Sequence, residues 1–239
     1  MHPMNATHGS HIVRPLIRTS ARALCLGLAI AASGCTAAGN AESRANEADE
    51  RLRYGKYDEA LAEVEPVVQK HPGDWRAQFA YGRALMGKER LDDARRALDR
   101  AHRLQPANEE VCLALAECMA KQKDVKDAYQ LLRGFGKDFR SWRAYMGLSR
   151  IAEDAGDPDT AETAALDAIK VNEPLPGQRA SIEPYVRAAD LSFRFGKKSD
   201  GVRRLRQAYG IAPQDPRVRE GLASHAVDLD DTTAIDLGP

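Results

Sequence analysis

The sequence predicts an all-α protein built as an array of helix–turn–helix repeats, and three observations lead to this fold class. The 239 residues are rich in alanine and leucine, only 6% are aromatic, and runs of β-branched residues are few, which favours helix over sheet. A short pattern recurs about every 34 residues over most of the chain. A residue that commonly caps the N-terminus of a helix stands directly before each unit that follows the first repeat.

The first segment of the chain resembles a secretory signal. Arg14, Arg18 and Arg22 precede an uncharged apolar stretch over 23–32, and residues 1–34 contain no acidic residue. So short a stretch cannot cross a hydrocarbon core, which needs about 20 residues in a helix. We therefore assign residues 1–34 to a signal peptide and exclude them from the fold.

The signal ends in Ala32-Ser33-Gly34-Cys35, which resembles a bacterial lipoprotein box. In that family the cysteine sulfur is acylated with diacylglycerol, because a thiolate is the nucleophile that attacks the lipid donor. The resemblance implies that Cys35 is lipidated and that the protein is an outer-membrane lipoprotein facing the periplasm, since Thr36 stands where an aspartate signals inner-membrane retention. Ala32 replaces the preferred leucine, so the alternative is secretion to the periplasm without a lipid.

Two segments flank the repeat region. Residues 35–46 follow the signal as a polar tether, which as a coil of about ten residues reaches about 17 Å. Residues 227–239 are acidic and lack the periodicity of a core-forming element, so we expect a disordered tail. The repeat domain is therefore expected over residues 47–226.

One small residue marks each repeat, at Ala60, Ala94, Ala128, Ala161 and Gly201. The first three are 34 residues apart, the fourth follows after 33 and the fifth after 40. A proline recurs at the same offset behind this residue, at Pro72, Pro106 and Pro213. This phase predicts five repeats, over 41–74, 75–108, 109–141, 142–175 and 182–215, and a last helix over 216–226 that caps the array.

Capping residues support this phase independently. The residue before each predicted first helix is a good N-cap in five places: Asp74, Asn108, Ser141, Ser181 and Asp215. Pro216 then takes the first helical position, where its missing N–H costs nothing, and Asp157-Pro158 opens a second helix in the same way.

The 34-residue pattern resembles the tetratricopeptide repeat over about 185 residues. The resemblance implies a right-handed superhelical solenoid, with small residues where helices touch. The eighth position of successive repeats holds Ala48, Gly82, Ala116, Ser149 and Ala189. The twenty-seventh holds Val67, Ala101, Phe135, Ala168 and Ala208, of which only Val67 and Phe135 are large.

Two irregularities interrupt the pattern. The third repeat ends in "GFGKDFR", without a proline and one residue short, and "NEPLPGQRA" after the fourth repeat is an insertion of about six residues. We expect both to be tolerated loops between packed units, with a functional insertion as the alternative.

The sequence contains no recognisable catalytic or metal-binding constellation. His71 and His102 lie in different repeats, and the common metalloprotease, phosphate-loop and serine-hydrolase motifs are missing. Cys112 and Cys118 lie about 120° apart on one predicted helix, so they cannot pair with each other and are expected to be buried. We therefore expect no enzyme activity, no cofactor, no metal and no small-molecule substrate.

Charge gives no reason to expect nucleic acid as a partner, because 35 Lys and Arg balance 35 Asp and Glu. The resemblance instead implies that the inner helices line a concave groove for a protein or peptide. Apolar anchors are expected there at Phe79, Met86, Leu113, Met146 and Phe193. Arginines are expected around them at Arg76, Arg83, Arg143, Arg150 and Arg194. Such a groove suits an amphipathic or acidic segment, and the alternative is that these side chains pack against the neighbouring repeat.

The order of parts resembles tetratricopeptide lipoproteins of Flp pilus assembly. That layout implies a protein–protein interaction scaffold, held at the membrane through the Cys35 lipid, that acts in assembly of a pilus or secretion system. The alternative is an accessory subunit of an envelope polysaccharide or cell-wall enzyme complex.

Overall fold

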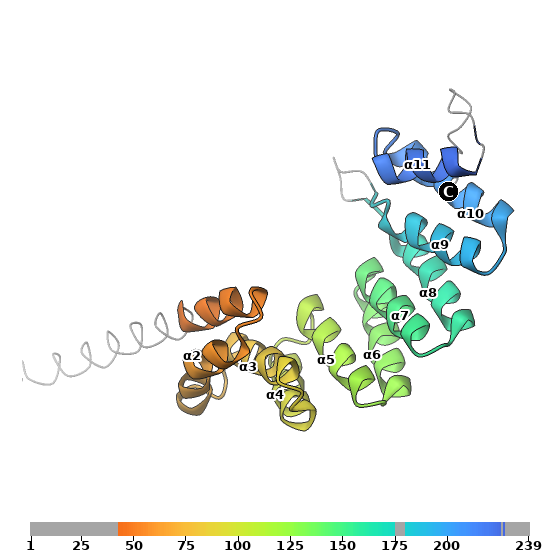
Figure 1. Ribbon diagram of the computed structural model, residues 1–239. Coiled ribbons are helices and arrows are strands. Elements are labelled where there is room, and N and C mark those ends of the chain that lie inside the picture. Colours follow the sequence, from red (N-terminus) through yellow and green to blue (C-terminus); the bar gives the residue numbers. More distant parts are fainter. Residues whose placement is uncertain (1–42, 175–179, 226, 228–239) are drawn as a thin grey trace, which may run out of the picture. The chain divides into compact units, whose positions relative to one another are not determined.

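The computed structural model describes residues 43–174, 180–225 and 227, and all the regular structure of these residues is helical (Figure 1). The first helical residues described are 43–53. They are followed by α2 (Tyr57–Lys70), α3 (Trp75–Gly87), α4 (Leu91–Leu104), α5 (Glu109–Lys121), α6 (Val125–Asp138), α7 (Trp142–Asp154), α8 (Pro158–Val171), α9 (Glu183–Arg194), α10 (Lys198–Ile211) and α11 (Pro216–Ser224). The predicted all-α array of helix–turn–helix units is confirmed.

The two flanks are only partly within the described residues. The signal peptide over 1–34, Cys35 and the tail after Val227 lie outside them. Residues 43–46, which we assigned to the tether, are already helical, and Ala45 among them is buried.

Most of the predicted caps are confirmed. The side-chain oxygens of Asp74, Asn108, Ser141 and Asp215 accept hydrogen bonds from backbone N–H groups in the first turns of α3, α5, α7 and α11. Helix α9 differs, because Ile182 takes the N-cap position and Ser181 lies one residue earlier. The backbone of Ser181 is tied to the Asn172 side chain, and its hydroxyl still accepts the Glu183 N–H at 3.3 Å.

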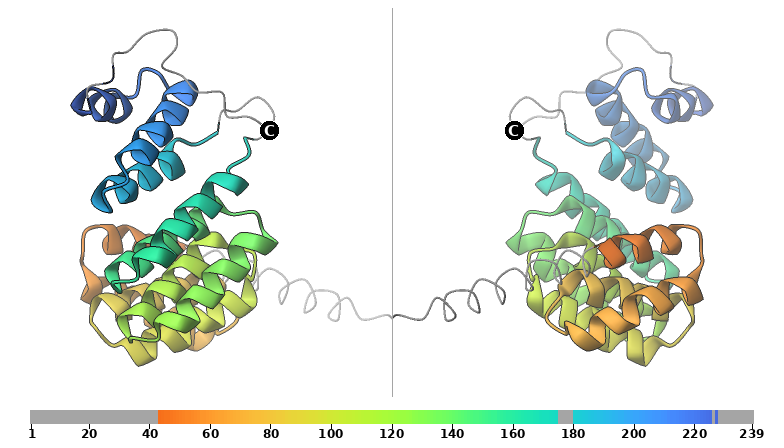
Figure 2. Two further views of the ribbon diagram at one scale, coloured as in Figure 1. Left: turned by 90° about the vertical axis from the view of Figure 1, so that its right-hand side faces the viewer. Right: turned by 90° about the vertical axis from the view of Figure 1, so that its left-hand side faces the viewer.

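Consecutive helices lie side by side along the array (Figures 1 and 2). Helices α3, α5, α7 and α9 also contact one another in turn, so the odd-numbered helices form a row of their own. We call these odd-numbered helices the inner row and the even-numbered helices the outer row.

The small residues of the repeat lie where the helices meet. All the residues predicted at the eighth and twenty-seventh positions are buried, including the larger Val67 and Phe135. The small residues that mark each repeat, Ala60, Ala94, Ala128, Ala161 and Gly201, are buried as well. A Cβ atom added to Gly82 would lie 2.6 Å from Cγ of Leu98 on the paired helix, so only glycine fits there. The burial confirms the predicted phase of the repeat.

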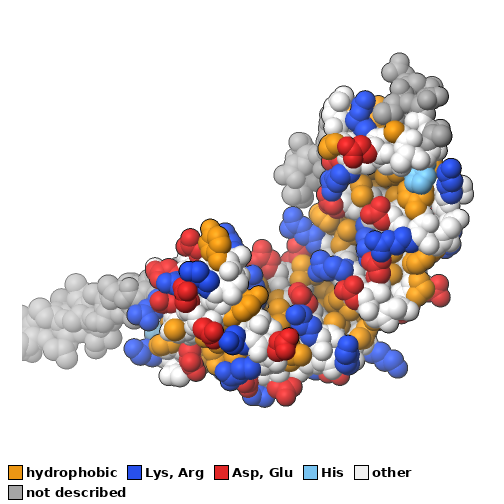
Figure 3. Space-filling model, viewed as in Figure 1, with side chains coloured by type: hydrophobic (Ala, Val, Ile, Leu, Met, Phe, Trp, Pro, Cys, Tyr) orange, Lys and Arg blue, Asp and Glu red, His pale blue; other side chains and the backbone are white. Residues whose placement is uncertain are grey.

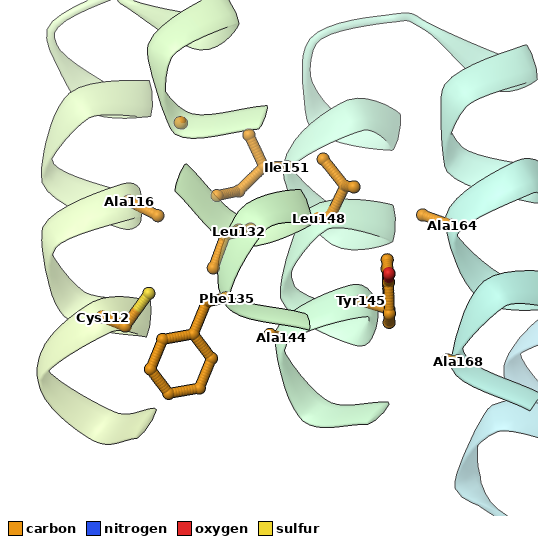
Figure 4. Close-up of a cluster of buried hydrophobic side chains, with 11 residues drawn as sticks. Cys112, Ala116, Leu132, Phe135, Ala144, Tyr145, Leu148, Ile151, Ala164 and Ala168 are labelled. Atoms are coloured by element: carbon orange, nitrogen blue, oxygen red, sulfur yellow. The ribbon is translucent and has the colours of Figure 1, made fainter. Parts of the chain in front are cut away.

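Apolar side chains from four successive helices form the largest buried cluster (Figure 4). Helix α5 contributes Cys112 and Ala116, and α6 contributes Leu132 and Phe135. Further side chains come from α7 and α8, so the cluster runs across the boundary between the third and fourth repeats. Each repeat thus depends on its neighbours for its core, as expected of a repeat array.

A left-handed residue follows the helix over 43–53 and each of α3, α5, α7 and α9. These residues are Gly55, Glu89, Lys123, Gly156 and Gly196, with φ between +58° and +74°. Three of these positions hold glycine, which adopts this conformation without a Cβ clash. Glu89 and Lys123 adopt it at a cost of about 1–2 kcal/mol each.

Candidate functional site

The apolar groove residues predicted from the sequence lie on the inner row but are partly covered by neighbouring repeats. Leu113 and Met146 pack against the cluster shared by α5, α6 and α7. A Cβ atom on Gly147 of α7 would lie 2.6 Å from Cδ2 of Leu113, so this leucine fills the space between two repeats. Phe79 and Met86 are likewise half-buried against the cluster between the second and third repeats.

Phe193 lies away from the other predicted anchors. A Cβ atom added to Gly201 of α10 would lie 2.4 Å from the Phe193 ring. The ring also stacks on His225, just after α11, with ring centroids 3.9 Å apart. Phe193 therefore packs between the fifth repeat and the capping helix.

Most of the predicted arginines have partners within the array. Arg83 forms an ion pair with Asp49 and its guanidinium lies 5.4 Å from the centre of the Phe79 ring. Arg143 lies 3.3 Å from Glu109, and Arg194 forms an ion pair with Glu153.

The other two predicted arginines, Arg76 and Arg150, have different surroundings. The guanidinium of Arg76 lies 4.9 Å from the centre of the Trp75 ring. Arg150 is exposed and forms no ion pair within the described part of the chain.

Arg150 lines a pocket of ≈ 580 Å³ between the C-terminal halves of α5 and α7. We call it the α5–α7 pocket. Its apolar lining comes from Ala120, Val125, Ile151 and Ala155. Its charged lining comes from Glu117, Lys121, Lys123, Arg150 and Asp154. None of these five charged side chains forms an ion pair within the residues that the structure describes.

Glu117 and Lys121 of α5 and Asp154 of α7 were not among the site residues predicted from the sequence, which gave no reason to prefer them over the arginines. Lys123 was missed altogether, because it belongs to the turn after α5. Its signal is the left-handed conformation with φ +72°, where three other repeats use glycine. Strain of this kind is found disproportionately at functional sites.

In two other hollows of the array, most of the lining charges are already paired. A wider hollow of ≈ 740 Å³ lies beside α4, but its Arg95 forms ion pairs with Asp124 and Asp127. A smaller hollow of ≈ 360 Å³ lies at the turn before α7, where Arg140 pairs with Glu173 at 2.6 Å. The α5–α7 pocket is therefore the better candidate for a binding site, although it is not the largest.

A buried polar contact joins α7 to α9 across the insertion. The Ser149 hydroxyl is fully buried, donates to the carbonyl of Ala161 at 2.8 Å and accepts from Nε of Arg187 at 3.1 Å. The Arg187 guanidinium also lies 2.6 Å from the Glu153 carboxylate. These bonds keep the inner row continuous where the sequence repeat is interrupted.

The two described cysteines are structural. Cys112 and Cys118 are free and buried, as predicted. Burial, and then the nearby Glu109 carboxylate, raises the pKa of Cys112 to about 12. Burial also raises the pKa of Cys118, so neither thiol forms a reactive thiolate near neutral pH.

Over residues 43–174, 180–225 and 227, no three His, Cys, Asp or Glu side chains are grouped closely enough to hold a metal ion. No helix in the described part of the chain has the length and apolar character needed to cross a membrane.

Comparison with known proteins identifies the repeat. Residues 46–109 and 89–145 each match a tetratricopeptide repeat model. No curated protein matches the chain significantly in sequence.

Two solved structures are similar in fold. MamA from Desulfovibrio magneticus RS-1, from residue 41 to its end, aligns with a TM-score of 0.53 and 17% identity, over 74% of this chain and 97% of that chain. A thermophilic TPR protein from Thermus thermophilus aligns with a TM-score of 0.53 and 17% identity, over 78% of this chain and 98% of that chain. At this identity the likeness shows the fold alone.

Proposed function

We propose that this tetratricopeptide-repeat protein is a lipid-anchored scaffold that binds a partner polypeptide in the α5–α7 pocket. Tetratricopeptide repeats are typical of protein–protein interaction scaffolds. The observation that carries the proposal is the set of five unpaired charged side chains around this pocket, in an inner row whose other predicted arginines are mostly paired.

The lining of the pocket suits a polypeptide. The side chains of Val125, which is partly exposed, and Ala155, which is exposed, offer apolar surface, whose burial by a partner opposes dissociation. The charges on both sides orient the partner and raise the rate of association, because they attract it over a distance. Lys123 extends the site onto the turn after α5, and Arg150 and Asp154 of α7 belong to the next repeat, so the partner contacts two repeats.

Photo-crosslinking identifies the partner. A photoreactive residue in place of Ala155, which lines the pocket and is exposed, is expected to capture the partner in cells that produce the full chain. The same residue in place of Gln130, exposed on outer-row α6, is the control and is expected to capture much less. Equal capture from both positions would place the binding surface elsewhere.

Replacing Lys123 with glycine tests the pocket without disturbing the fold. The change removes one cation and relieves the left-handed strain. Glycine loses more backbone entropy on folding, which offsets part of this gain, so the free energy of unfolding should change by less than about 1 kcal/mol. The crosslinked partner, once purified, is expected to bind about tenfold more weakly, which corresponds to about 1.4 kcal/mol.

The matched control is Glu89→Gly, which makes the same backbone change one repeat earlier and lies outside the pocket. It is expected to leave the dissociation constant unchanged in the same titration. If both variants bind the partner like the wild type, Lys123 has no part in recognition and the pocket is not the site.

The lipid anchor is proposed at Cys35, supported by the basic flank and the small residues before it in the sequence. In a bacterium, Cys35→Ser is expected to move the protein from the membrane to the soluble fraction, or to leave its signal uncleaved. Labelled palmitate should mark the wild type only. A soluble wild type that begins at another residue would refute lipidation.

The identity of the partner would show in which envelope system the protein acts. We propose a pilus or secretion machine, because the order of signal, lipidation site and repeats resembles that of Flp pilus assembly lipoproteins. A crosslinked pilus or secretin subunit supports this assignment, whereas a glycosyltransferase or cell-wall enzyme supports the accessory-subunit alternative.

A further inference from the structure

The inner helices carry charges that alternate in sign from one repeat to the next. The second and ninth positions of each repeat lie two turns apart on the same helix. They are basic in α3 and α7 and acidic in α5 and α9. The residues are Arg76 and Arg83, Glu110 and Glu117, Arg143 and Arg150, and Glu183 and Asp190. We call the pair on each helix a charge stripe.

Ion pairs join single stripe residues to a charge on the neighbouring inner-row helix. Arg143 of α7 lies 3.3 Å from Glu109 of α5, and Arg217 of α11 lies 3.0 Å from Glu183 of α9. Arg83 of α3 is paired with Asp49 in the helix over 43–53, one repeat length earlier in the sequence. Consistent with these pairs, Figure 3 shows both signs of charge interspersed over the visible face.

At the α5–α7 pocket, two ninth-position charges of opposite sign line the same hollow without pairing. Glu117 and Arg150 both line this pocket but form no ion pair with each other. Each is therefore available to a charge of opposite sign on a partner. The Glu117 carboxylate attracts a basic group and the Arg150 guanidinium attracts an acidic group. A partner that contacts both must therefore carry basic and acidic side chains.

We propose that the inner row binds an extended segment whose charges alternate in sign at every third residue. This inference rests on the proposed function and specifies its partner. Packed helices lie about 8–10 Å apart, which sets the spacing of the stripes. A polyproline II segment has three residues per turn and rises about 3.1 Å per residue, so every third side chain returns to the same face after about 9 Å.

The same observations disfavour the amphipathic or acidic segments expected from the sequence. An amphipathic helix needs a broad apolar surface, but Leu113 and Met146 are already packed against neighbouring repeats. An acidic segment would meet like charges on α5 and α9, and these oppose binding.

Two synthetic peptides test the order of charges. Both are fluorescein-labelled and have the same composition and net charge. The alternating probe is Glu-Pro-Ala-Lys-Pro-Ala-Glu-Pro-Ala-Lys, and the blocked probe is Glu-Pro-Ala-Glu-Pro-Ala-Lys-Pro-Ala-Lys. Fluorescence anisotropy with the full chain at low ionic strength is expected to give at least tenfold tighter binding of the alternating probe. Raising the salt concentration should reduce this difference.

Exchanging the two central charges should reverse the preference. Glu117→Lys combined with Arg150→Glu changes the order of ninth-position charges over α3, α5, α7 and α9 from alternating to blocked. This variant is expected to bind the blocked probe more tightly. The control exchanges a paired couple off the inner row, Asp58→Lys with Lys88→Asp, and should keep the wild-type preference.

The inference is overturned if the wild type binds both probes equally or binds neither, or if the folded exchange variant keeps the wild-type preference. Circular dichroism establishes that the variant is helical, and the wild-type comparison decides the question even if it is not. A partner crosslinked from position 155 and weakened by Lys123→Gly would still support the proposed function, so the two failures are distinguishable.

Discussion

Replacing Leu132 with alanine is expected to lower the free energy of unfolding by about 2–5 kcal/mol. Leu132 lies on α6 and is fully buried between α5 and α7 (Figure 4). One of its methyl carbons is 3.6 Å from the position of a Cβ on Gly147, so it fills space at the boundary between two repeats. Truncation removes apolar surface from this boundary and leaves a cavity, because both neighbouring helices are held by their own repeats.

Urea denaturation followed by circular dichroism measures this loss. The matched control is Leu104→Ala at the end of α4, where the leucine is 40% exposed and its truncation should cost well under 1 kcal/mol. Equal midpoints for the two variants would show that the boundary between the third and fourth repeats is not packed as described.

Ala94→Leu is expected to cost about 1–3 kcal/mol for the opposite reason, since it adds volume to a filled interface. Ala94 has no exposed surface and belongs to the cluster that contains Leu85 and Leu98. The paired helices α3 and α4 already approach so closely there that Gly82 has no room for a side chain. A leucine at residue 94 must therefore push α4 away from α3 or adopt a strained rotamer.

Ala62→Leu is the matched control, because Ala62 is an exposed alanine inside α2 and leucine has nearly the same helix propensity. Thermal unfolding should show a lower melting temperature for Ala94→Leu alone. Equal melting temperatures would contradict the phase of the repeat, which places Ala94 at a contact and Ala62 in solvent.

The features that could be predicted from the sequence are local or periodic. Asp74 and Asn108 cap helices through bonds to residues two or three positions away, so the residue type and its place suffice to identify them. Ala60 and Ala128 recur with the repeat, and a recurring small residue indicates a recurring helix contact. The fold class and the repeat phase follow from signals of these two kinds.

The features that could not be predicted depend on side chains brought together from different repeats. Arg187 bonds to Ser149 from 38 residues away, across an insertion that breaks the period. Leu113 lies at a groove position, and only the approach of Gly147 shows that its side chain fills a contact between repeats. Lys123 belongs to the pocket because a left-handed turn places it there, and the pattern of helices does not report turn geometry.

The bond between Asn172 and Ser181 identifies a position where the chain can be engineered. The Asn172 amide is buried, donates to the Ser181 carbonyl at 2.6 Å and accepts the Ser181 N–H at 3.1 Å. The two ends of the intervening stretch are therefore fixed by their own hydrogen bonds, whatever its length. Each doubling of such a stretch costs only about 0.6 kcal/mol of closure entropy. An affinity tag or a fluorescent reporter inserted between these two residues should leave the stacking of the repeats intact. The protein could then be purified or detected through a position away from the α5–α7 pocket.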